Sequence, residues 1–236
     1  METVATDTRL DDRLAVVVRP TTGKDWPGVV MIHEAWGIDA ELRSQAARLA
    51  AAGFVVIAPD LFGEGPRLRC MIAVFKALRA RSGPAFDLLG RAREELLHDA
   101  QGNGRVGVIG FCLGGGFALL LSSEGYEASS VNYGMIPADV EEVLSGACPV
   151  VASYGGLDAQ LVKQVPRLQA ALEKNNVTHD LEVYPNAGHS FLNATNNAPA
   201  LIRPLMRLAH GGPEPVAAAD AWRRIETFFG EHLRTA

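Results

Sequence analysis

Cys112 is the residue of this chain with the clearest potential for nucleophilic chemistry. It lies in the segment 110–116 (GFCLGGG), between an apolar run at 106–109 that favours a strand and a second run at 117–121 that favours a helix. A strand that turns through a Gly-x-nucleophile-x-Gly step into a helix holds the nucleophile exposed at the carboxyl end of the strand. The sequence therefore predicts that Cys112 is a catalytic nucleophile rather than a buried packing residue.

An aspartate and a histidine follow the cysteine, and nucleophile, acid and then histidine is one of the chain orders known for catalytic triads. Asp158 lies in the loop after the apolar run 150–153, and His189 lies in the loop after the run 181–183. A thiol needs an imidazole to take its proton, and the imidazole needs a carboxylate to fix its tautomer and stabilise its charged form. We predict that these two side chains complete a triad with the cysteine. The alternative for Asp158 is that it caps a helix beginning near Leu161.

Attack on a carbonyl carbon also requires donors for the oxyanion that develops. The first predicted donor is the backbone N–H of Leu113, assisted by the positive end of the helix that follows the nucleophile. The second must come from another loop. Its best source is the segment 33–39 (HEAWGID) after the predicted strand 28–32, where the amide of Ala35 faces the turn if the two strands are neighbours.

These residues require a sheet whose strands end on the same side. Apolar, β-branched runs predict strands at 14–18, 28–32, 54–58, 106–109, 130–133, 150–154 and 181–184. Helical periodicity predicts helices at 40–52, 67–80, 84–99, 113–122, 161–174 and 217–233. Near-continuous apolar strands that alternate with helices indicate an α/β fold, with a mostly parallel sheet covered by helices on both faces. Ligands of such sheets bind beyond the carboxyl ends of the strands.

The length and charge of the chain bound its class. A chain of 236 residues favours one domain spanning residues 1–236. Lys and Arg number 22 against 27 Asp and Glu, and no run or helix face is strongly basic. We therefore expect no nucleic-acid partner.

The terminus and the cysteines indicate the compartment. The segment 1–7 (METVATD) is polar and acidic, whereas a secretory signal needs a basic segment followed by about 7–15 apolar residues. No stretch approaches the roughly 20 apolar residues that span a bilayer. The cysteines at 70, 112 and 148 are odd in number and widely spaced, which suits a reducing compartment. We expect a soluble, cytoplasmic protein with no membrane partner.

Five segments together resemble one known family. They are GFCLGGG at 110–116, HEAWGID at 33–39, APDLF at 58–62, GGLD at 155–158 and AGHSF at 187–191. Over roughly residues 14–229 the chain is similar to the dienelactone hydrolase family. The resemblance implies an α/β-hydrolase fold whose mostly parallel sheet has about seven to eight strands. It also implies a Cys-Asp-His triad that cleaves ester or lactone bonds through an acyl-enzyme, without a cofactor.

The resemblance further implies a role for Glu34. The family's glutamate after this early strand contacts the thiol in the resting enzyme and takes part in converting it to the thiolate. A carboxylate beside a thiol disfavours the thiolate, so Glu34 would keep Cys112 unreactive and less easily oxidised until substrate rearranges the site. The alternative is that Glu34 is a solvated charge at the end of a strand.

Two positions depart from the family. Members that hydrolyse dienelactone hold the substrate carboxylate with two arginines, and this chain has Glu64 and Asn193 at those positions. Neither side chain is a cation that can form two parallel hydrogen bonds with a carboxylate. Dienelactone itself is therefore not favoured as the substrate. Arg67, Arg69 and Arg203 are the candidates to reach the site from elsewhere, although the surface of a helix is the commoner place for an arginine.

Aromatic side chains offer a different substrate contact. Trp36, Phe62, Phe191 and Tyr133 are candidates to line an apolar acyl pocket. For any one of them, plain core packing is the alternative.

Other chemistries are less favoured by the sequence. His33 has no second histidine at helical spacing, so a structural role is favoured over metal binding and no metal is expected. A function of another class is a thiol-based small-molecule binding or sensor protein on the same fold, with negligible turnover. The leading prediction is a hydrolase of small esters or lactones that is a monomer or a small homo-oligomer.

Overall fold

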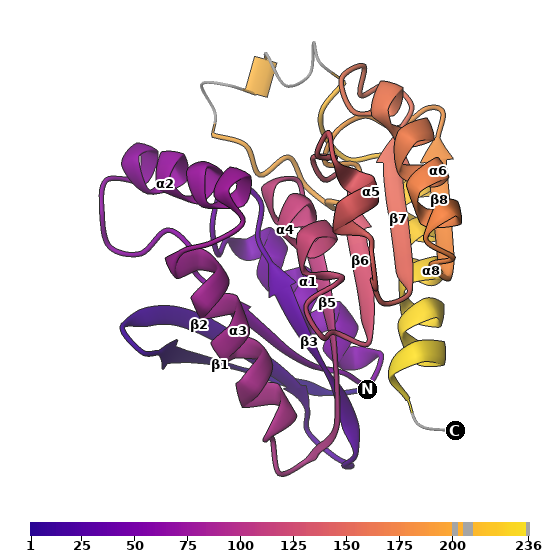
Figure 1. Ribbon diagram of the computed structural model, residues 1–236. Helices are drawn as coiled ribbons and strands as arrows, with labels where there is room; N and C mark the ends of the chain where they lie inside the picture. The colour runs from indigo at the N-terminus through magenta and orange to yellow at the C-terminus, as the bar shows by residue number, and fades with distance from the viewer. Residues whose placement is uncertain (200–202, 205–209, 235–236) are drawn as a thin grey trace.

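The computed structural model describes residues 1–199, 203–204 and 210–234, which form an eight-stranded sheet in the order β1-β2-β4-β3-β5-β6-β7-β8 (Figure 1). The strands are β1 (Thr3–Leu10), β2 (Arg13–Pro20), β3 (Trp26–Ile32), β4 (Val55–Pro59), β5 (Gly102–Phe111), β6 (Ala128–Asn132), β7 (Val150–Gly155) and β8 (His179–Tyr184). Strands β3 to β8 pair in parallel, whereas β1 with β2 and β2 with β4 are antiparallel. The predicted α/β fold and its mostly parallel sheet are confirmed.

Helices cover both faces of this sheet. They are α1 (Ala40–Ala51), α2 (Arg67–Ala80), α3 (Pro84–Leu97), α4 (Leu113–Leu121), α5 (Val140–Val143), α6 (Val165–Lys174) and α8 (Pro215–Leu233), with a short 3₁₀ turn, η1 (Val162–Gln164). The apolar faces of α1 and α8 share one buried cluster with alternate strand residues such as Val29 and Met31. Helices α2 to α6 contribute to the other cluster, which contains Val30 and Ile32. The alternation of side chains along each strand therefore divides the core into two layers.

Three elements differ from the sequence prediction. Strand β1 was not predicted, because six of its eight residues are exposed and it lies at the edge of the sheet, where pairing with β2 stabilises it. The four-residue α5 is too short to show a helical period. The helix predicted at 161–174 begins instead as η1 and becomes α-helical at Val165, next to Pro166 in the first turn.

The parallel strands carry the predicted site residues to a common edge. The loops after β3, β5, β7 and β8 contain Glu34, Cys112, Asp158 and His189, respectively. In Figure 1 these strands all point toward the top of the view, away from the N-terminus and the final turn of α8. Within the described residues, no helix combines the length and the apolar character needed to cross a membrane.

Candidate active site

Cys112 lies in the sharp turn between β5 and α4 with φ 55° and ψ −114°. A positive φ at a residue other than glycine persists only where the surrounding structure enforces it. Close backbone packing does so here. A Cβ atom on Gly110 would lie 1.9 Å from the carbonyl oxygen of Gly114, and a Cβ atom on Gly114 would lie 2.2 Å from that of Ile32. The two glycines are therefore required for the turn that presents the partly exposed thiol of Cys112.

His189 and Asp158 are in direct contact. The Nδ1 atom of His189 lies 2.7 Å from Oδ2 of Asp158. An imidazole that donates from Nδ1 to a carboxylate presents Nε2 as the atom that accepts a proton. The other carboxylate oxygen, Oδ1, accepts a hydrogen bond of 3.2 Å from the backbone N–H of Leu161. Asp158 therefore makes both contacts that the sequence offered as alternatives, one to the histidine and one to the following turn.

The charges at this contact favour an imidazolium. Burial lowers the pKa of His189, but the Cys112 sulfur and the Asp158 carboxylate raise it more strongly, and the net pKa lies well above the usual 6.5. Burial raises the pKa of Asp158, but the hydrogen bond and charge of His189 and the amides of Leu161 and Gln160 bring it below 3.8. A protonated His189 held by an ionised Asp158 is the state that stabilises a thiolate.

The backbone amides of Leu113 and Ala35 lie on two segments that pack together. A Cβ atom on Gly114, in the first turn of α4, would lie 2.2 Å and 2.9 Å from the carbonyl oxygens of Ile32 and His33. Ala35 follows Ile32 by three positions and His33 by two. In the described part of the chain, neither amide donates a hydrogen bond to a backbone carbonyl, and the role of both as oxyanion donors stays a prediction.

Glu34 is buried, with 6% of its surface exposed, so it is not the solvated strand-end charge that the sequence left open. Its Oε2 atom accepts hydrogen bonds from Nδ2 of Asn193 at 3.1 Å and Nδ2 of Asn197 at 3.2 Å. Its Oε1 atom is buried and has no hydrogen-bond partner among residues 1–199, 203–204 and 210–234. The contact between Glu34 and the Cys112 thiol therefore stays a prediction.

Tyr133 lies between the histidine and the core. It follows β6 directly with φ 40° and is 1% exposed. Its ring centroid lies 5.1 Å from that of His189 and 5.6 Å from that of Phe191. Burial, followed by the charges of Glu34 and Cys112, raises its pKa well above 10. Its hydroxyl is therefore neutral, and no described residue hydrogen-bonds to it.

The other predicted pocket aromatics have different surroundings. Trp36 lines a cavity of about 470 Å³ together with Ala35. Phe62 is 5% exposed, and its ring packs 4.7 Å from that of His33. Phe191 has no exposed surface and packs between Tyr133 and Tyr184. These surroundings match core packing, the alternative to lining an acyl pocket.

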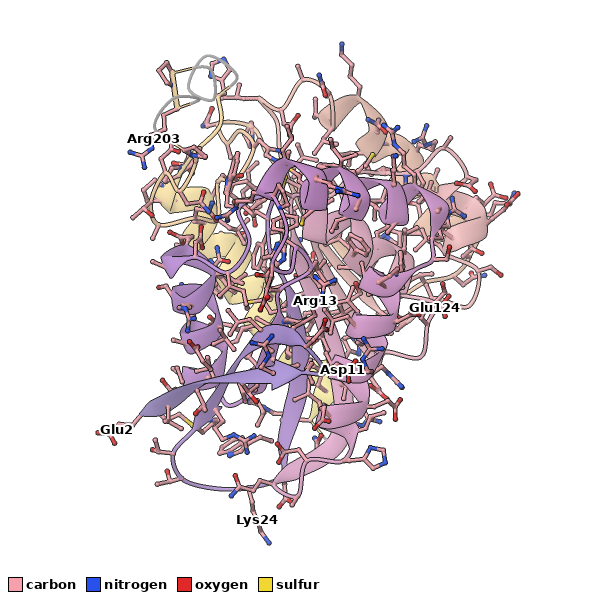
Figure 2. The ribbon with its side chains drawn as sticks, turned by 90° about the vertical axis from the view of Figure 1, so that its left-hand side faces the viewer. Glu2, Asp11, Arg13, Lys24, Glu124 and Arg203 are labelled. Carbon is pink, nitrogen blue, oxygen red and sulfur yellow. The ribbon has the colours of Figure 1, made fainter. Side chains whose placement is uncertain are left out.

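The two positions that lack the family arginines are used differently. Glu64 is exposed and pairs with Arg9 at 3.3 Å. Asn193 is 2% exposed and hydrogen-bonds to Glu34. Arg67 and Arg203, however, line the cavity that contains Trp36, and neither forms an ion pair with a described carboxylate. Figure 2 places Arg203 at the edge of the molecule, far from Glu2 and Lys24 at the opposite end.

His33 has a structural role. It is fully buried, its Nδ1 lies 2.6 Å from the carbonyl oxygen of Glu34, and its Nε2 accepts from the backbone N–H of Leu61 at 3.0 Å. It therefore links the loops after β3 and β4. In the described ranges, no three His, Cys, Asp or Glu side chains gather as a metal site, and Cys70, Cys112 and Cys148 are free thiols.

Sequence reasoning missed the polar residues that hold the loop after His189. Glu41 is 6% exposed and accepts hydrogen bonds from the amides of Ala194 and Thr195 and from the Thr195 hydroxyl. Gln45, also buried, donates to Asn193 at 2.9 Å. Both lie in a predicted helix where polar residues normally face water, so nothing in the local pattern indicates their burial.

Comparison with known proteins gives a consistent family assignment. The model of the dienelactone hydrolase family matches residues 14–233. The carboxymethylenebutenolidase of Rhodococcus opacus is 27% identical over 223 aligned residues, with 87% of this chain and 81% of that protein covered. That of Pseudomonas putida is 27% identical over 184 residues, with 72% and 77% covered. Among solved structures, a dienelactone hydrolase-like promiscuous phosphotriesterase from metagenomic libraries has a TM-score of 0.75 at 20% identity, with 99% of each chain covered.

The match extends over nearly all of the elements that build the fold and the candidate site. The α/β-hydrolase fold predicted from the sequence is confirmed by both the sheet and the structural neighbour. The chain therefore belongs to the dienelactone hydrolase family and is a hydrolase of ester or lactone bonds.

Proposed function

We propose that this hydrolase works through a cysteine acyl-enzyme on Cys112. The observation that carries the proposal is the 2.7 Å contact between His189 and Asp158 at the same sheet edge as a thiol held in a strand-to-helix turn. That contact leaves Nε2 of His189 to take the thiol proton, while Asp158 stabilises the imidazolium.

The reaction then follows in two steps. The Cys112 sulfur attacks the carbonyl carbon, and the backbone amides of Leu113 and Ala35 stabilise the oxyanion. The C–O bond to the leaving alcohol breaks, and the alcohol takes its proton from His189. Water then gives a proton to His189 and attacks the thioester, which releases the carboxylic acid and returns the proton to the sulfur. Glu34 is assigned the role of restraining the thiol in the resting enzyme.

We propose that the substrate carries an anionic group in addition to its ester. The cavity of about 470 Å³ beside Ala35 and Trp36 is lined by two arginines, Arg67 and Arg203, together with Asp39. A guanidinium binds a carboxylate with two parallel hydrogen bonds. Arg67 and Arg203 would therefore supply the positive charge for a substrate carboxylate that Glu64 and Asn193 cannot supply.

A panel of p-nitrophenyl esters tests the acyl-enzyme. Cys112→Ala and His189→Ala are expected to abolish turnover of the acetate and butyrate esters, while Cys70→Ala, which changes a thiol outside the site, retains it. Mass spectrometry after a rapid quench should find one acyl group on the peptide that contains Cys112. Full activity in Cys112→Ala or His189→Ala would contradict the proposal.

The same experiment distinguishes the sensor alternative. A sensor would label once at Cys112 and release no further product, whereas a hydrolase gives multiple turnovers per thiol. The cytoplasmic location, the single domain over residues 1–236, the absence of a nucleic-acid partner and the monomer or small homo-oligomer all stay predictions.

A further inference from the structure

Strand β1 leaves one edge of the sheet open. Within the described ranges it pairs only with β2, and six of its eight side chains are exposed. Figure 2 views the molecule from this side, with β1 running between Glu2 at the left-hand rim and Asp11 near the centre. The unpaired N–H and C=O groups of such an edge are a template for another strand.

The register with β2 shows which backbone groups point out of this edge. The backbone N–H of Thr21 donates to the carbonyl oxygen of Glu2 at 3.1 Å, so these residues form a hydrogen-bonded pair. In an antiparallel ladder, such pairs alternate with pairs that make no hydrogen bond to each other. Thr3 faces Pro20, which has no N–H, as this alternation requires. The residues whose N–H and C=O groups point away from β2 are therefore Thr3, Ala5, Asp7 and Arg9.

These outward groups are not used elsewhere in the described part of the chain, where none of them makes a backbone hydrogen bond to a loop or a helix. The charged side chains of β1 are already paired, Asp7 with Arg43 at 2.7 Å and Arg9 with Glu64 at 3.3 Å. The strand contains neither proline nor lysine, two residues that protect sheet edges from pairing. The edge is therefore free to pair and carries little uncompensated charge.

The opposite edge of the sheet is better protected. Strand β8 contains His179, Asp180 and Glu182 among its six residues. Arg224 of α8 lies against two of them, with Nε 3.0 Å from Oδ2 of Asp180 and Nη1 3.7 Å from Oε2 of Glu182. Charged side chains at this density disfavour pairing with another strand. Of the two edges, β1 is therefore the one suited to association.

We propose that two copies of this chain associate through β1, with the two strands antiparallel about a two-fold axis at Thr6. Thr3 then faces Arg9 of the second copy, and Ala5 faces Asp7 of the second copy. All four outward residues thus pair with outward residues, which a ladder requires. The two sheets would join into one continuous sheet, with eight strands from each copy.

The side chains of β1 favour this axis over its neighbours. An axis at Asp7 would place two carboxylates directly opposite each other, which is destabilising. An axis at Ala5 would make Arg9 face Met1, whose amino group already donates to the carbonyl oxygen of Ala51. With the axis at Thr6, no like charges are directly opposed.

The same axis also matches the other face of the strand. Val4, 46% exposed in the single chain, would face Thr8 of the second copy, and the two Thr6 side chains would face each other. Pairs of β-branched side chains stabilise neighbouring strands. The strand is therefore complementary to itself, and a second copy of the chain is the partner that it fits.

Cysteine cross-linking of the full chain tests the position of the axis. The two copies of residue 6 would form a pair without mutual hydrogen bonds, in which the Cα atoms lie about 4.5 Å apart, a distance that a disulfide can join. Oxidation of Thr6→Cys by copper phenanthroline should therefore give a dimer on a non-reducing gel. Peptide mass spectrometry should locate the disulfide at position 6 and distinguish it from links through the native thiols.

Val4→Cys and Thr8→Cys are the matched controls. Each introduced thiol would lie about 13 Å along the strand from its own counterpart, so either variant alone should cross-link at least about ten-fold less. An equal mixture of the two variants should cross-link position 4 to position 8. Equal yields from the three single variants, or no cross-link at position 6, would overturn the proposal.

Sedimentation velocity measures the association without a cross-link. Wild type should shift from monomer toward dimer between about 1 μM and about 200 μM, because one strand pair buries less area than a standard stable interface. Ala5→Pro removes an outward N–H that β2 does not use, and an edge strand accepts proline. This variant should stay monomeric. A monomeric wild type, or a dimer that Ala5→Pro leaves intact, would contradict the proposal.

The association is independent of the proposed mechanism, because Cys112, Asp158 and His189 all lie outside β1. Ala5→Pro should therefore keep wild-type activity on p-nitrophenyl butyrate, which also shows that it folds. If it does not fold, the cross-linking of Thr6→Cys decides the question. Failure of the acyl-enzyme would appear instead as full activity in Cys112→Ala, whatever the state of association.

Discussion

In the proposed mechanism, a thiol at position 112 replaces the hydroxyl that a serine hydrolase would use, and this changes the role proposed for His189. A thiol ionises far more readily than a hydroxyl, so an imidazolium can stabilise a thiolate before substrate binds. The raised pKa of His189 and the lowered pKa of Asp158 suit that arrangement. In that arrangement, the carboxylate of Asp158 stabilises the imidazolium of His189 beside the Cys112 thiolate.

Asp158→Asn keeps the shape of the side chain and removes its charge. The imidazolium loses its partner and the imidazole its enforced tautomer, so kcat for p-nitrophenyl acetate should fall by about 100-fold or more. Steady-state kinetics on protein with an unchanged circular dichroism spectrum measures this. A decrease of less than about three-fold would show that Asp158 serves only as the cap of the following turn.

The raised pKa of His189 also predicts how stability depends on pH. The folded state binds this proton more tightly than the unfolded state. The contribution to stability is therefore fully present below 6.5 and is lost as the pH rises through the higher pKa of the folded protein. Between about pH 7 and about pH 10, wild type should lose more free energy of unfolding in urea than His189→Gln does. Parallel losses in the two proteins would contradict this.

The guanidinium groups of Arg67 and Arg203 predict a selective defect. For a p-nitrophenyl ester that carries a terminal carboxylate, Arg67→Gln and Arg203→Gln should each raise KM by about ten-fold, because a charge-assisted hydrogen bond is lost. The KM for the neutral butyrate ester should change by less than about two-fold. Equal changes for the two substrates would show that the arginines do not contact an anionic group.

At the scale of elements, the site depends on how closely α4 approaches β3. The carbonyl oxygen of Ile32 occupies the space that any side chain at position 114 would need, whereas Gly90 on the exposed side of α3 has no heavy atom within 4 Å of its Cβ position. Because both glycines lie in helices, the same substitution at the two positions compares a packed site with an open one.

Gly114→Ala and Gly90→Ala should have opposite effects on stability. The first substitution forces the start of α4 away from the end of β3. It should lower the unfolding free energy by more than about 2 kcal/mol and also reduce activity. The second improves helix propensity without a clash and should stabilise the protein by up to about 1 kcal/mol. Urea unfolding of both variants measures this, and similar effects at the two positions would contradict the packing argument.

At the scale of the whole molecule, one sheet separates two apolar layers that share every strand from β2 to β7. Trp26 packs against the layer that contains α3 and α4, and Trp222 lies in the layer that contains α1 and α8. Neither layer can lose its packing without exposing the other side of the same strands. The chain should therefore unfold as a single unit.

Variants that retain only Trp26 or only Trp222 test this expectation. Their fluorescence transitions in urea should coincide with each other and with circular dichroism to within about 0.2 M. Two separate midpoints would indicate that the layers unfold independently and that the single domain predicted for residues 1–236 is wrong.

Much of the fold was predictable because strands and helices follow local patterns. Helix α2 has the predicted bounds, and β5 and α4 lie on either side of the predicted nucleophile turn. Strand β1 was missed because its side chains are mostly exposed, so it carries no apolar signal and depends on a partner strand.

By itself, the sequence determined the order of the elements, the glycine-flanked turn at Cys112 and the succession of Asp158 and His189, since each depends on residues that are close in the chain. Only the tertiary structure decided that Glu34 is buried, that Asn193 holds it, and that Arg67 and Arg203 meet at one cavity. Glu34 and Asn193 are separated by 159 positions. No local pattern specifies such a contact, because it is formed by the packing of loops that the parallel sheet brings to one edge.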